Sequence, residues 1–290
     1  MILLGYFLRK EKIIDEVFEH DLGKLLVDVI QPICIIGSGN TVFSKELSHN
    51  LSCAAVIAVI YYIISIFFMF LFSRILKAEK TAKNIFVMLC VFANTGYLGM
   101  PILSEFFGAE GMLYAVIYSL VYNLFFFSIG IVIISGKTDH VLKKIFTTPA
   151  TISSILAIIL FVSPFRLPVP IADTVNQVGS MMVPLSIIII GCKLADIKLL
   201  DVLTDRLSYC VSFFRLIFFP ICLLFILKPF HLDNSLASSL VLLTGMPSGT
   251  LNAIVADQYH CEEDFAARAV SQSTFLMIAT LPLIFLLLGE

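Results

Sequence analysis

Long apolar runs separated by short polar turns occupy almost the whole chain. A helix that spans a membrane needs about 20 predominantly apolar residues. Nine runs approach or reach that length, near residues 22–38, 51–73, 84–106, 111–135, 147–164, 174–192, 207–228, 235–256 and 265–288. This pattern predicts an all-α protein that crosses a membrane many times.

A further apolar stretch, MILLGYFL, opens the chain and ends in the basic turn RKEK. At about 1.5 Å per residue it reaches about 12 Å, which is too short to cross a bilayer. A signal peptide is the competing interpretation, but no charge precedes the apolar residues and no cleavage-like site follows them. We interpret the stretch as the truncated remnant of a first helix, which predicts ten segments in all.

The distribution of lysine and arginine indicates the orientation, because cytoplasmic loops of membrane proteins carry an excess of these residues. With the RKEK turn in the cytoplasm and alternating segments, 15 of the 19 basic residues lie inside and three outside. The remaining one, Arg215, lies within a span. We therefore predict a multi-pass protein of the cell membrane with both termini outside.

Two pairs of motifs recur in the two halves of the chain. QPICIIGSG, with Pro32, is matched by VPLSIIIIGCKLA, with Pro184. GMPI, with Pro101, is matched by GMPSGTLNA, with Pro247. Interrupted helices at matching positions of two halves are typical of secondary transporters.

The repetition predicts the domain organisation. Five segments in each half is an odd number, so the two halves insert in opposite orientations. We predict a first inverted repeat over residues 1–135, a short cytoplasmic linker over 136–146 and a second inverted repeat over 147–290.

Helix-breaking residues interrupt two of the apolar runs. Gly96, Gly99 and Pro101 lie in the fourth segment, and Pro247 lies in the ninth. Unsatisfied backbone groups in lipid are costly, so such breaks persist only where they are buried or line a wet cavity. If the breaks cross at the midplane, their half-helix N-termini offer partial positive charge to an anion. Proline kinks that serve packing alone are the alternative.

Residues beside the two breaks are the candidates for binding a substrate. They are Asn94, Thr95, Gly96, Gly99, Pro101, Pro247, Ser248, Thr250, Asn252 and Arg215. For the polar residues, a hydrogen bond between helices is the alternative role. Arg215 lies deep in a span, where it binds a carboxylate substrate or balances a buried acid such as Glu105 or Asp257.

Four residues are candidates for coupling transport to an ion, namely Glu105, Asp257, Asn123 and Gln272. The two carboxylates are the best candidates for carrying a proton, although solvation near a helix end is the commoner role. Asn123 and Gln272 lie in uninterrupted spans, where an interhelical hydrogen bond is at least as good an interpretation. No cofactor is expected beyond coupling to H⁺ or Na⁺.

Composition narrows the class of protein further. The chain is 59% hydrophobic and 14% charged, whereas soluble domains carry about a quarter charged residues. The net charge of −2 and the lack of a basic patch argue against nucleic acid as a partner. Seven scattered cysteines show neither a disulfide framework nor metal-ligand spacing. An intramembrane enzyme is disfavoured, because no acid pair or histidine lies in the middle of a span.

The motifs around the two breaks carry a family resemblance. FANTGYLGMPI in the first half and GMPSGTLNAIVADQY in the second resemble the auxin efflux carrier family, whose bacterial branch includes malonate and malate permeases. The resemblance covers nearly the whole chain. It implies a ten-helix inverted repeat, similar to bile-acid symporters and sodium–proton antiporters, in which crossed helices 4 and 9 bind an organic anion. It also implies a homodimer formed by scaffold helices 1, 2, 6 and 7, and an elevator-like motion of the other helices.

The sequence thus predicts a secondary transporter that moves a small organic anion, a carboxylate, by alternating access. A membrane sensor or interaction protein with a transporter-like fold is the alternative that the short first helix favours. The intact polar residues at both breaks argue against it. A channel is a further alternative, but a crossover that occludes the path suits a carrier better.

Overall fold

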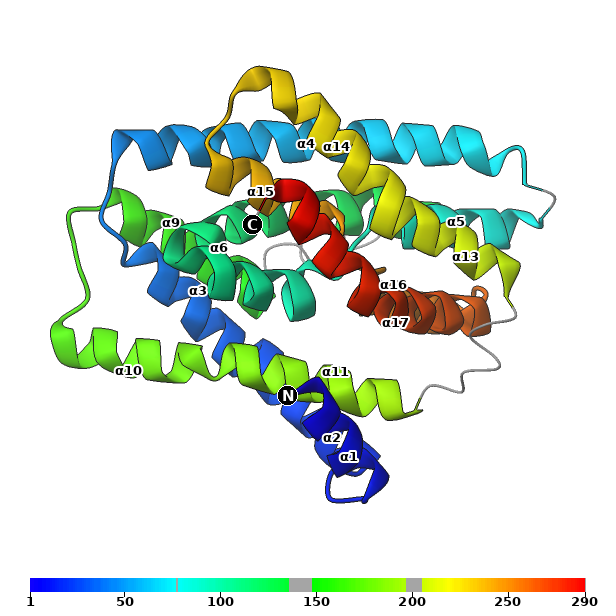
Figure 1. Cartoon of the computed structure of the whole chain (residues 1–290), viewed down its shortest axis with the longest axis horizontal. Helices are drawn as coiled ribbons and strands as arrows, with labels where there is room; N and C mark the ends of the chain where they lie inside the picture. Colours follow the sequence, from blue (N-terminus) through cyan, green and yellow to red (C-terminus); the bar gives the residue numbers. More distant parts are fainter. Residues whose placement is uncertain (77, 136–147, 197–204, 290) are drawn as a thin grey trace.

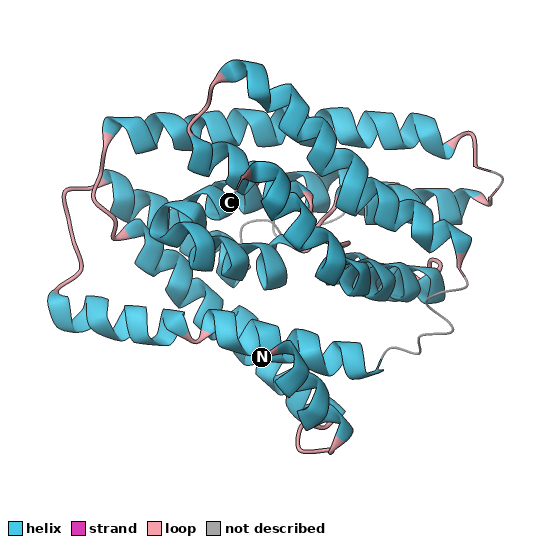
Figure 2. Ribbon diagram, viewed as in Figure 1, coloured by secondary structure: helices cyan, strands magenta, loops and turns pink. Residues whose placement is uncertain are grey.

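The computed structural model describes residues 1–76, 78–135, 148–196 and 205–289 (Figure 1). In these residues the regular elements are helices, and no strand is present (Figure 2). Six helical stretches of the described part are long and apolar enough to cross a membrane: Glu16–Gly39, Lys45–Ser73, Thr95–Ile134, Val169–Lys193, Arg206–Phe230 and Glu263–Leu288. The prediction of an all-α, multi-pass membrane protein is confirmed, whereas the total of ten segments stays a prediction.

The N-terminal helices lie at one corner of the molecule (Figure 1). α1 (Ile2–Lys10) ends at the predicted basic turn and packs along α11 (Met182–Asp196). α2 (Glu16–Leu25) continues through the π-helical turn η1 (Leu26–Ile30) into α3 (Gln31–Gly39).

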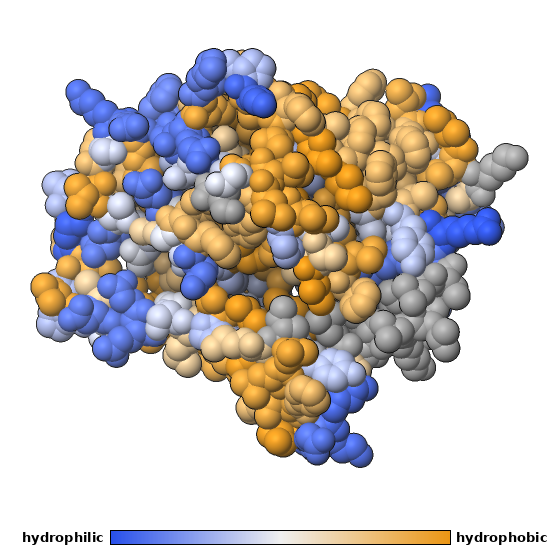
Figure 3. All heavy atoms as spheres, viewed as in Figure 1, coloured by the Kyte–Doolittle hydropathy of each residue, from blue (hydrophilic) through white to orange (hydrophobic). Residues whose placement is uncertain are grey.

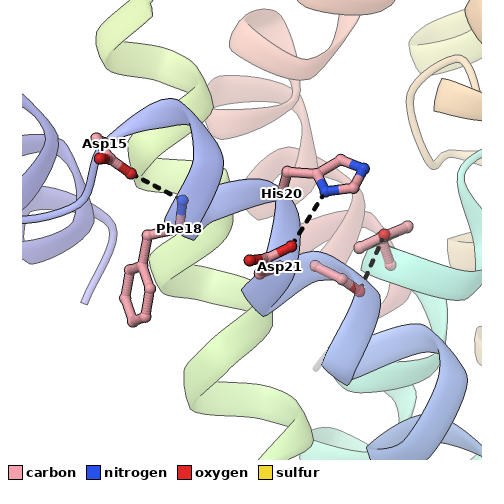
Figure 4. A network of polar contacts seen from close by, with 6 residues as sticks. Asp15, Phe18, His20 and Asp21 are labelled. Atoms are coloured by element: carbon pink, nitrogen blue, oxygen red, sulfur yellow. Dashed lines mark hydrogen bonds and ion pairs between the residues drawn. The ribbon is translucent and has the colours of Figure 1, made fainter.

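Polar side chains mark the start of α2 (Figure 4). The carboxylate of Asp15 caps the helix by accepting a hydrogen bond from the backbone amide of Phe18 at 2.8 Å. Nδ1 of His20 lies 3.5 Å from Oδ1 of Asp21, and both side chains are exposed. Such a cap satisfies one of the amides that the first turn of a helix leaves free. The local sequence therefore sets where this helix begins.

The first half continues with α4 (Lys45–Ser73), α5 (Lys80–Val91), the π-helical turn η2 (Thr95–Gly99), α6 (Met100–Phe125), the π-helical turn η3 (Phe126–Gly130) and α7 (Ile131–Ser135). α6 contains a sharp turn at Gly108, where φ is 59° and ψ is −143°. Glycine adopts a positive φ without steric cost. The turn separates two helices that run one after the other, in agreement with separate apolar runs at 84–106 and 111–135.

The second half comprises α9 (Pro149–Val162), α10 (Val169–Ser180), α11, α13 (Arg206–Phe213), the π-helical turn η4 (Phe214–Phe218), α14 (Phe219–Leu227), the 3₁₀ turn η5 (Lys228–Phe230), α15 (Asn234–Thr244), α16 (Thr250–Gln258) and α17 (Glu263–Leu288). The predicted linker 136–146 lies outside the described residues.

Apolar side chains cover much of the outer surface, while hydrophilic residues gather mainly toward the left end of the long axis, with a smaller group toward the right (Figure 3). On α4 the exposed side chains include Val56, Ile60, Ile63 and Phe67. Soluble proteins rarely expose continuous apolar patches of this kind. The surface is that of a protein whose solvent is lipid along the middle of its helices and water at their ends.

α5 lies at the centre of the bundle. Every residue from Ile85 to Val91 is buried, and α4, α13, α16 and α17 pack around the helix. The backbone that follows α5 is therefore shielded from lipid, which is the condition under which a membrane helix can be broken.

Glycine allows α3 and α9 to approach closely. A Cβ at Gly39 would overlap the backbone carbonyl oxygen of Ala157 in α9. We expect Gly39→Ala to push the helices apart and lower the melting temperature in detergent, because overpacking costs about 1–3 kcal/mol. Gly23→Ala is the matched control, since a Cβ there meets only the Tyr97 hydroxyl, at 3.4 Å. Equal melting temperatures for the two variants would contradict this prediction.

Candidate functional site

Two interruptions of the helices lie against each other inside the bundle. The first, residues 92–94, separates α5 from η2, and the second, residues 245–249, separates α15 from α16. α5 runs in from the right of Figure 1 and α15 from the left. We call the two interruptions together the crossing.

The two interruptions hold each other by backbone hydrogen bonds. Ala93 pairs with Ser248 in an antiparallel bridge. The amide of Asn94 donates to the carbonyl of Pro247 at 2.8 Å, and the amide of Gly249 donates to the carbonyl of Phe92 at 2.9 Å. Each interruption thereby satisfies backbone groups that the other would leave unpaired in an apolar environment.

The first break lies upstream of the position that the motifs indicate. Pro101 lies in the first turn of α6, whereas Pro247 lies within the second interruption itself. The prediction that Pro101 and Pro247 mark breaks at matching positions is therefore wrong for Pro101. The π-helical turn η2 directly precedes Pro101, and such local π adjustments let a membrane helix accommodate a proline without interrupting the chain. Asn94 is the residue that faces Pro247.

Asn94 caps the half-helix that leaves the first interruption. Its Oδ1 accepts a hydrogen bond from the amide of Tyr97 at 3.2 Å, and its side chain is nearly buried. Within the described residues its Nδ2 makes no hydrogen bond and the amide of Gly96 has no acceptor. These two N–H donors are available to a ligand at the N-terminus of η2.

The half-helix α16 leaves the second interruption in a similar way. In the part of the chain that the structure describes, the amides of Thr250 and Leu251 have no acceptor. The first turn of a helix exposes such donors and carries the positive end of the helix dipole. Two helix N-termini with unpaired amides therefore start from the same crossing within the described residues.

Asn252 connects α16 to the opposite interruption. Its Nδ2 donates to the carbonyl of Phe92 at 2.8 Å and to Oγ of Ser248 at 3.2 Å. Its Oδ1 is buried and has no partner among the described residues. Asn252 thus serves as a structural link across the crossing, which is the alternative role that the sequence leaves open.

Neighbouring side chains and glycines complete the site. Oγ of Ser119 donates to Oγ1 of Thr95 at 3.5 Å, and the amide of Ser248 donates to Oγ of Ser273 at 3.1 Å. A Cβ at Gly99 would lie 2.8 Å from Cδ2 of Leu243 in α15. Hydrogen bonds with Ser119 and Ser273 and close packing of Gly99 against α15 therefore both hold the crossing in place.

Gln31 is a site residue that the sequence analysis does not select. It is buried at the start of α3, and its Nε2 donates to Sδ of Met100 at 3.1 Å. A Cβ at Gly96 would lie 3.3 Å from the same Nε2, so Gln31 faces the η2 half-helix. The signal was a glutamine directly before Pro32 inside an apolar run.

Arg215 is fully buried and binds backbone carbonyls. Its Nε and Nη2 each donate to the carbonyl of Met246 at 3.1 Å, and Nη2 also donates to Thr244 at 2.8 Å. Nη1 donates to the carbonyls of Val91 at 3.1 Å and Cys90 at 3.3 Å, and to the hydroxyl of Tyr61 at 2.9 Å. These contacts engage the whole guanidinium group.

The charge of Arg215 is not balanced by Glu105 or Asp257, as one of the sequence alternatives proposed. Both carboxylates are exposed, and neither forms an ion pair with Arg215 within the described chain. Asp257 lies in the last turn of α16 and Glu105 in α6. The contacts of Arg215 favour its structural role over direct binding of a substrate.

A cavity of about 600 Å³ lies between α3, α6, α10 and α11. Its polar lining includes Ser38, Ser104, Glu105, Asn176 and Ser180. Ser104 lies eight residues beyond Gly96, which is about 12 Å along a helix. The cavity therefore meets the first-half helix about 12 Å beyond the N-terminus of η2, and its lining includes no residue of the crossing.

The two amides considered for coupling form hydrogen bonds between helices. Nδ2 of Asn123 in α6 donates to Oγ1 of Thr151 in α9 at 3.0 Å. Oε1 of Gln272 in α17 accepts from Oγ of Ser212 in α13 at 3.2 Å. Both contacts join neighbouring helices, which is the role that the sequence leaves open for these two residues. Within the described residues no group of three His, Cys, Asp or Glu could hold a metal ion.

The Asn123–Thr151 contact can be measured by a double-mutant cycle. We expect Asn123→Ala and Thr151→Ala to show a coupling energy of about 0.6 kcal/mol, and at most about 1.7, as for other polar pairs within membranes. The measurement is the melting temperature of the single and double variants in detergent. Fully additive effects would show that the contact contributes nothing to stability.

Comparison with known proteins shows the family of the chain. The family of membrane transport proteins matches residues 1–285 of the chain. An uncharacterized transporter of Methanothermobacter thermautotrophicus is 26% identical over 289 residues, which are 98% of this chain and 93% of the relative. The uncharacterized transporter MJ1031 of Methanocaldococcus jannaschii is 24% identical over 292 residues, 98% of this chain and 94% of the relative. The uncharacterized transporter YfdV of Escherichia coli K12 is 21% identical over 297 residues, 98% of this chain and 93% of the relative.

The match over nearly the full length points to a transporter rather than an enzyme. The chain belongs to the family of membrane transport proteins, which is the auxin efflux carrier family that its motifs resemble.

Proposed function

We propose that the protein is a secondary transporter that binds a small organic anion, a carboxylate, at the crossing and moves it across the cell membrane by alternating access. The observation that carries this proposal is the pair of half-helix N-termini with unpaired amides at Gly96, Thr250 and Leu251. Each N-terminus carries a partial charge of about +0.5, so two of them together match one carboxylate. Backbone amides can bind an anion without a basic side chain. Arg215 is not needed there, since its guanidinium already donates to backbone carbonyls.

Particular residues take particular roles in this proposal. Asn94 donates from Nδ2 to the anion, and Thr95, Ser248 and Thr250 line the site. Gly96 and Gly99 let the half-helix approach Gln31 and Leu243. Pro101 rigidifies the first turn of α6, and Pro247 keeps the second interruption extended.

Ten segments in two inverted repeats are part of the proposal. The turn at Gly108 divides one long helical stretch into two, and α9 and α15 are shorter apolar helices that would supply further segments. With α1, this arrangement supports ten segments and both termini outside. The antiparallel pairing of Ala93 with Ser248 is what two oppositely inserted halves would give.

An elevator-like motion requires that few strong contacts join the scaffold to the moving helices. α1, α2, α3, α9, α10 and α11 would form the scaffold and the homodimer contact. Within the described residues, the polar contacts that connect it to the rest include three hydrogen bonds. They are Tyr97 Oη to the carbonyl of Gly23 at 3.3 Å, Gln31 to Met100 at 3.1 Å and Asn123 to Thr151 at 3.0 Å. Glu105, which lines the cavity, is the carboxylate that would couple this motion to H⁺.

Uptake by proteoliposomes tests the proposal. We would measure labelled malonate, malate and an aromatic monocarboxylate with the parent protein, Asn94→Ala and Asn84→Ala. Asn84 is the matched control, because its Nδ2 donates to the carbonyl of Ile133 at 2.7 Å, outside the crossing. We expect saturable uptake of at least one carboxylate by the parent and Asn84→Ala, and reduced uptake by Asn94→Ala. Uptake that Asn94→Ala leaves unchanged, or no carboxylate uptake by the parent, would overturn the proposal.

A further inference from the structure

We propose that Arg215 is the resident cation of the crossing, and that its guanidinium group takes the place of a bound metal ion between the carbonyl ends of α5 and α15. The carrier would therefore need no Na⁺ to hold the crossing together. The inference rests on the proposed function only where uptake is measured.

The C-terminal ends of α5 and α15 need hydrogen-bond donors. α5 ends at Val91 and α15 ends at Thr244, and both ends lie in the buried crossing. The last four carbonyls of a helix have no partner within that helix. A buried carbonyl without a partner carries a large desolvation penalty. Oxygens that converge from two helix ends therefore call for a cation or a set of donors between them.

Arg215 supplies those donors to both helices at once. The guanidinium binds Cys90 and Val91 at the end of α5, and Thr244 and Met246 at the end of α15. Together with the hydroxyl of Tyr61, four carbonyl oxygens surround the group. Such rings of backbone carbonyls are the ligands that alkali cations find in membrane proteins.

The charges balance without a carboxylate. Each helix C-terminus carries about −0.5, so the two ends together offer about −1 to the guanidinium. Arginine keeps its proton in proteins, so the group stays a cation even when fully buried. Among the described residues, no carboxylate oxygen lies within 4.0 Å of Arg215. The backbone itself is the counter-charge.

The planar shape of the guanidinium explains why this position holds arginine rather than lysine. A guanidinium presents five N–H donors in a rigid planar fork, whereas the ammonium of lysine is a compact point charge. Only the fork can bond to two separate helix ends in one conformation. Arg215 lies in the π-helical turn η4, and such turns in α-helices frequently occur at functional sites.

The negative and positive helix ends at the crossing therefore have different partners. The carbonyl ends of α5 and α15 have a permanent cation, while the amide ends at η2 and α16 are left for the anion. The substrate then needs no metal cation as a companion at the crossing. Any ion coupling would have to act elsewhere, as it would at Glu105 in the cavity.

Thermal stability of the purified protein tests the inference without any transport assay. We expect the melting temperature of the parent to be the same in NaCl and in choline chloride at equal ionic strength. Arg215→Ala should lower it by roughly 10 °C, as removal of a buried charged partner does. Millimolar guanidinium should restore at least half of that loss. Guanidinium should not raise the melting temperature of the parent or of Arg206→Ala, which changes an exposed arginine of the same span.

The outcomes separate this inference from the proposed function. Specific stabilisation of the parent by Na⁺, or no rescue of Arg215→Ala by guanidinium, would overturn the resident-cation role whatever the uptake result. If Arg215→Ala cannot be purified, Arg215→Lys replaces it and should melt below the parent, because an ammonium reaches one helix end. A melting temperature equal to that of the parent would overturn the inference. With active proteoliposomes, uptake should be equal with and without Na⁺. Absence of all uptake would count against the proposed function and leave the stability result standing.

Discussion

Asn94→Asp is expected to reduce carboxylate uptake by about a hundredfold while the protein stays folded. The aspartate keeps the cap on Tyr97, and a negative charge is favourable at a helix N-terminus. The same charge repels an anion bound there. At a separation of about 5 Å and an effective dielectric constant of about 20, the repulsion is about 3 kcal/mol. The measurements are kcat/KM for uptake in proteoliposomes and the melting temperature in detergent.

Asn94→Ala is the control that distinguishes charge from structure. Alanine loses the cap, which costs about 1 kcal/mol of stability, but it adds no charge. Uptake should therefore fall in the order parent, Ala, Asp, while the melting temperature of the Asp variant should be at least that of the Ala variant. If uptake followed the melting temperature instead, the role of Asn94 would be structural alone.

Gly249→Ala is expected to abolish uptake and to destabilise the fold. A Cβ at this position would lie 2.9 Å from the carbonyl oxygen of Ala93 and 3.3 Å from that of Phe92. Both atoms belong to the backbone of the opposite interruption, so they cannot move without breaking the hydrogen bonds that join the two interruptions. Each buried group left unpaired costs about 1–3 kcal/mol. The measurements are again saturable uptake and the melting temperature.

Gly245→Ala is the matched control in the same interruption. A Cβ at Gly245 would lie 2.6 Å from Cδ1 of Ile284, which is the end of a flexible side chain and can rotate away. We expect this variant to keep most of its uptake. Backbone conformation does not distinguish the two sites, because both glycines have negative φ angles, −67° at Gly249 and −86° at Gly245. Wild-type uptake by Gly249→Ala would show that the close approach of the two backbones is dispensable.

The apolar runs of the sequence predict the long helices well, because lipid imposes a simple length and composition on a span. They do not place the first break. Residues 92–94 are Phe, Ala and Asn, which contain no strong helix breaker. The chain is extended there because it pairs with the second interruption, and such a tertiary contact has no local signature. Pro101 misleads for the converse reason, since the π-helical turn η2 before it accommodates the proline within a continuous helical stretch.

The partners of the charged and polar residues were harder to predict than the residues themselves. Arg215 is conspicuous in the sequence, but its partners are backbone carbonyls, which every residue carries. The interhelical roles of Asn123 and Gln272 were among the alternatives, and the structure provides their partners. The breaks along the chain do not point to Gln31, because this residue faces Gly96 from another helix.

The most direct test of an anion site at two helix N-termini is competition between a carboxylate and its neutral amide. Once a labelled carboxylate is found to be transported, its uptake is measured against the unlabelled acid and against the amide of the same shape. The helix dipoles favour a negative ligand, so the acid should compete at concentrations near KM and the amide should not compete. Equal competition by the amide would contradict the account, because a site that ignores charge does not use the amide ends of η2 and α16.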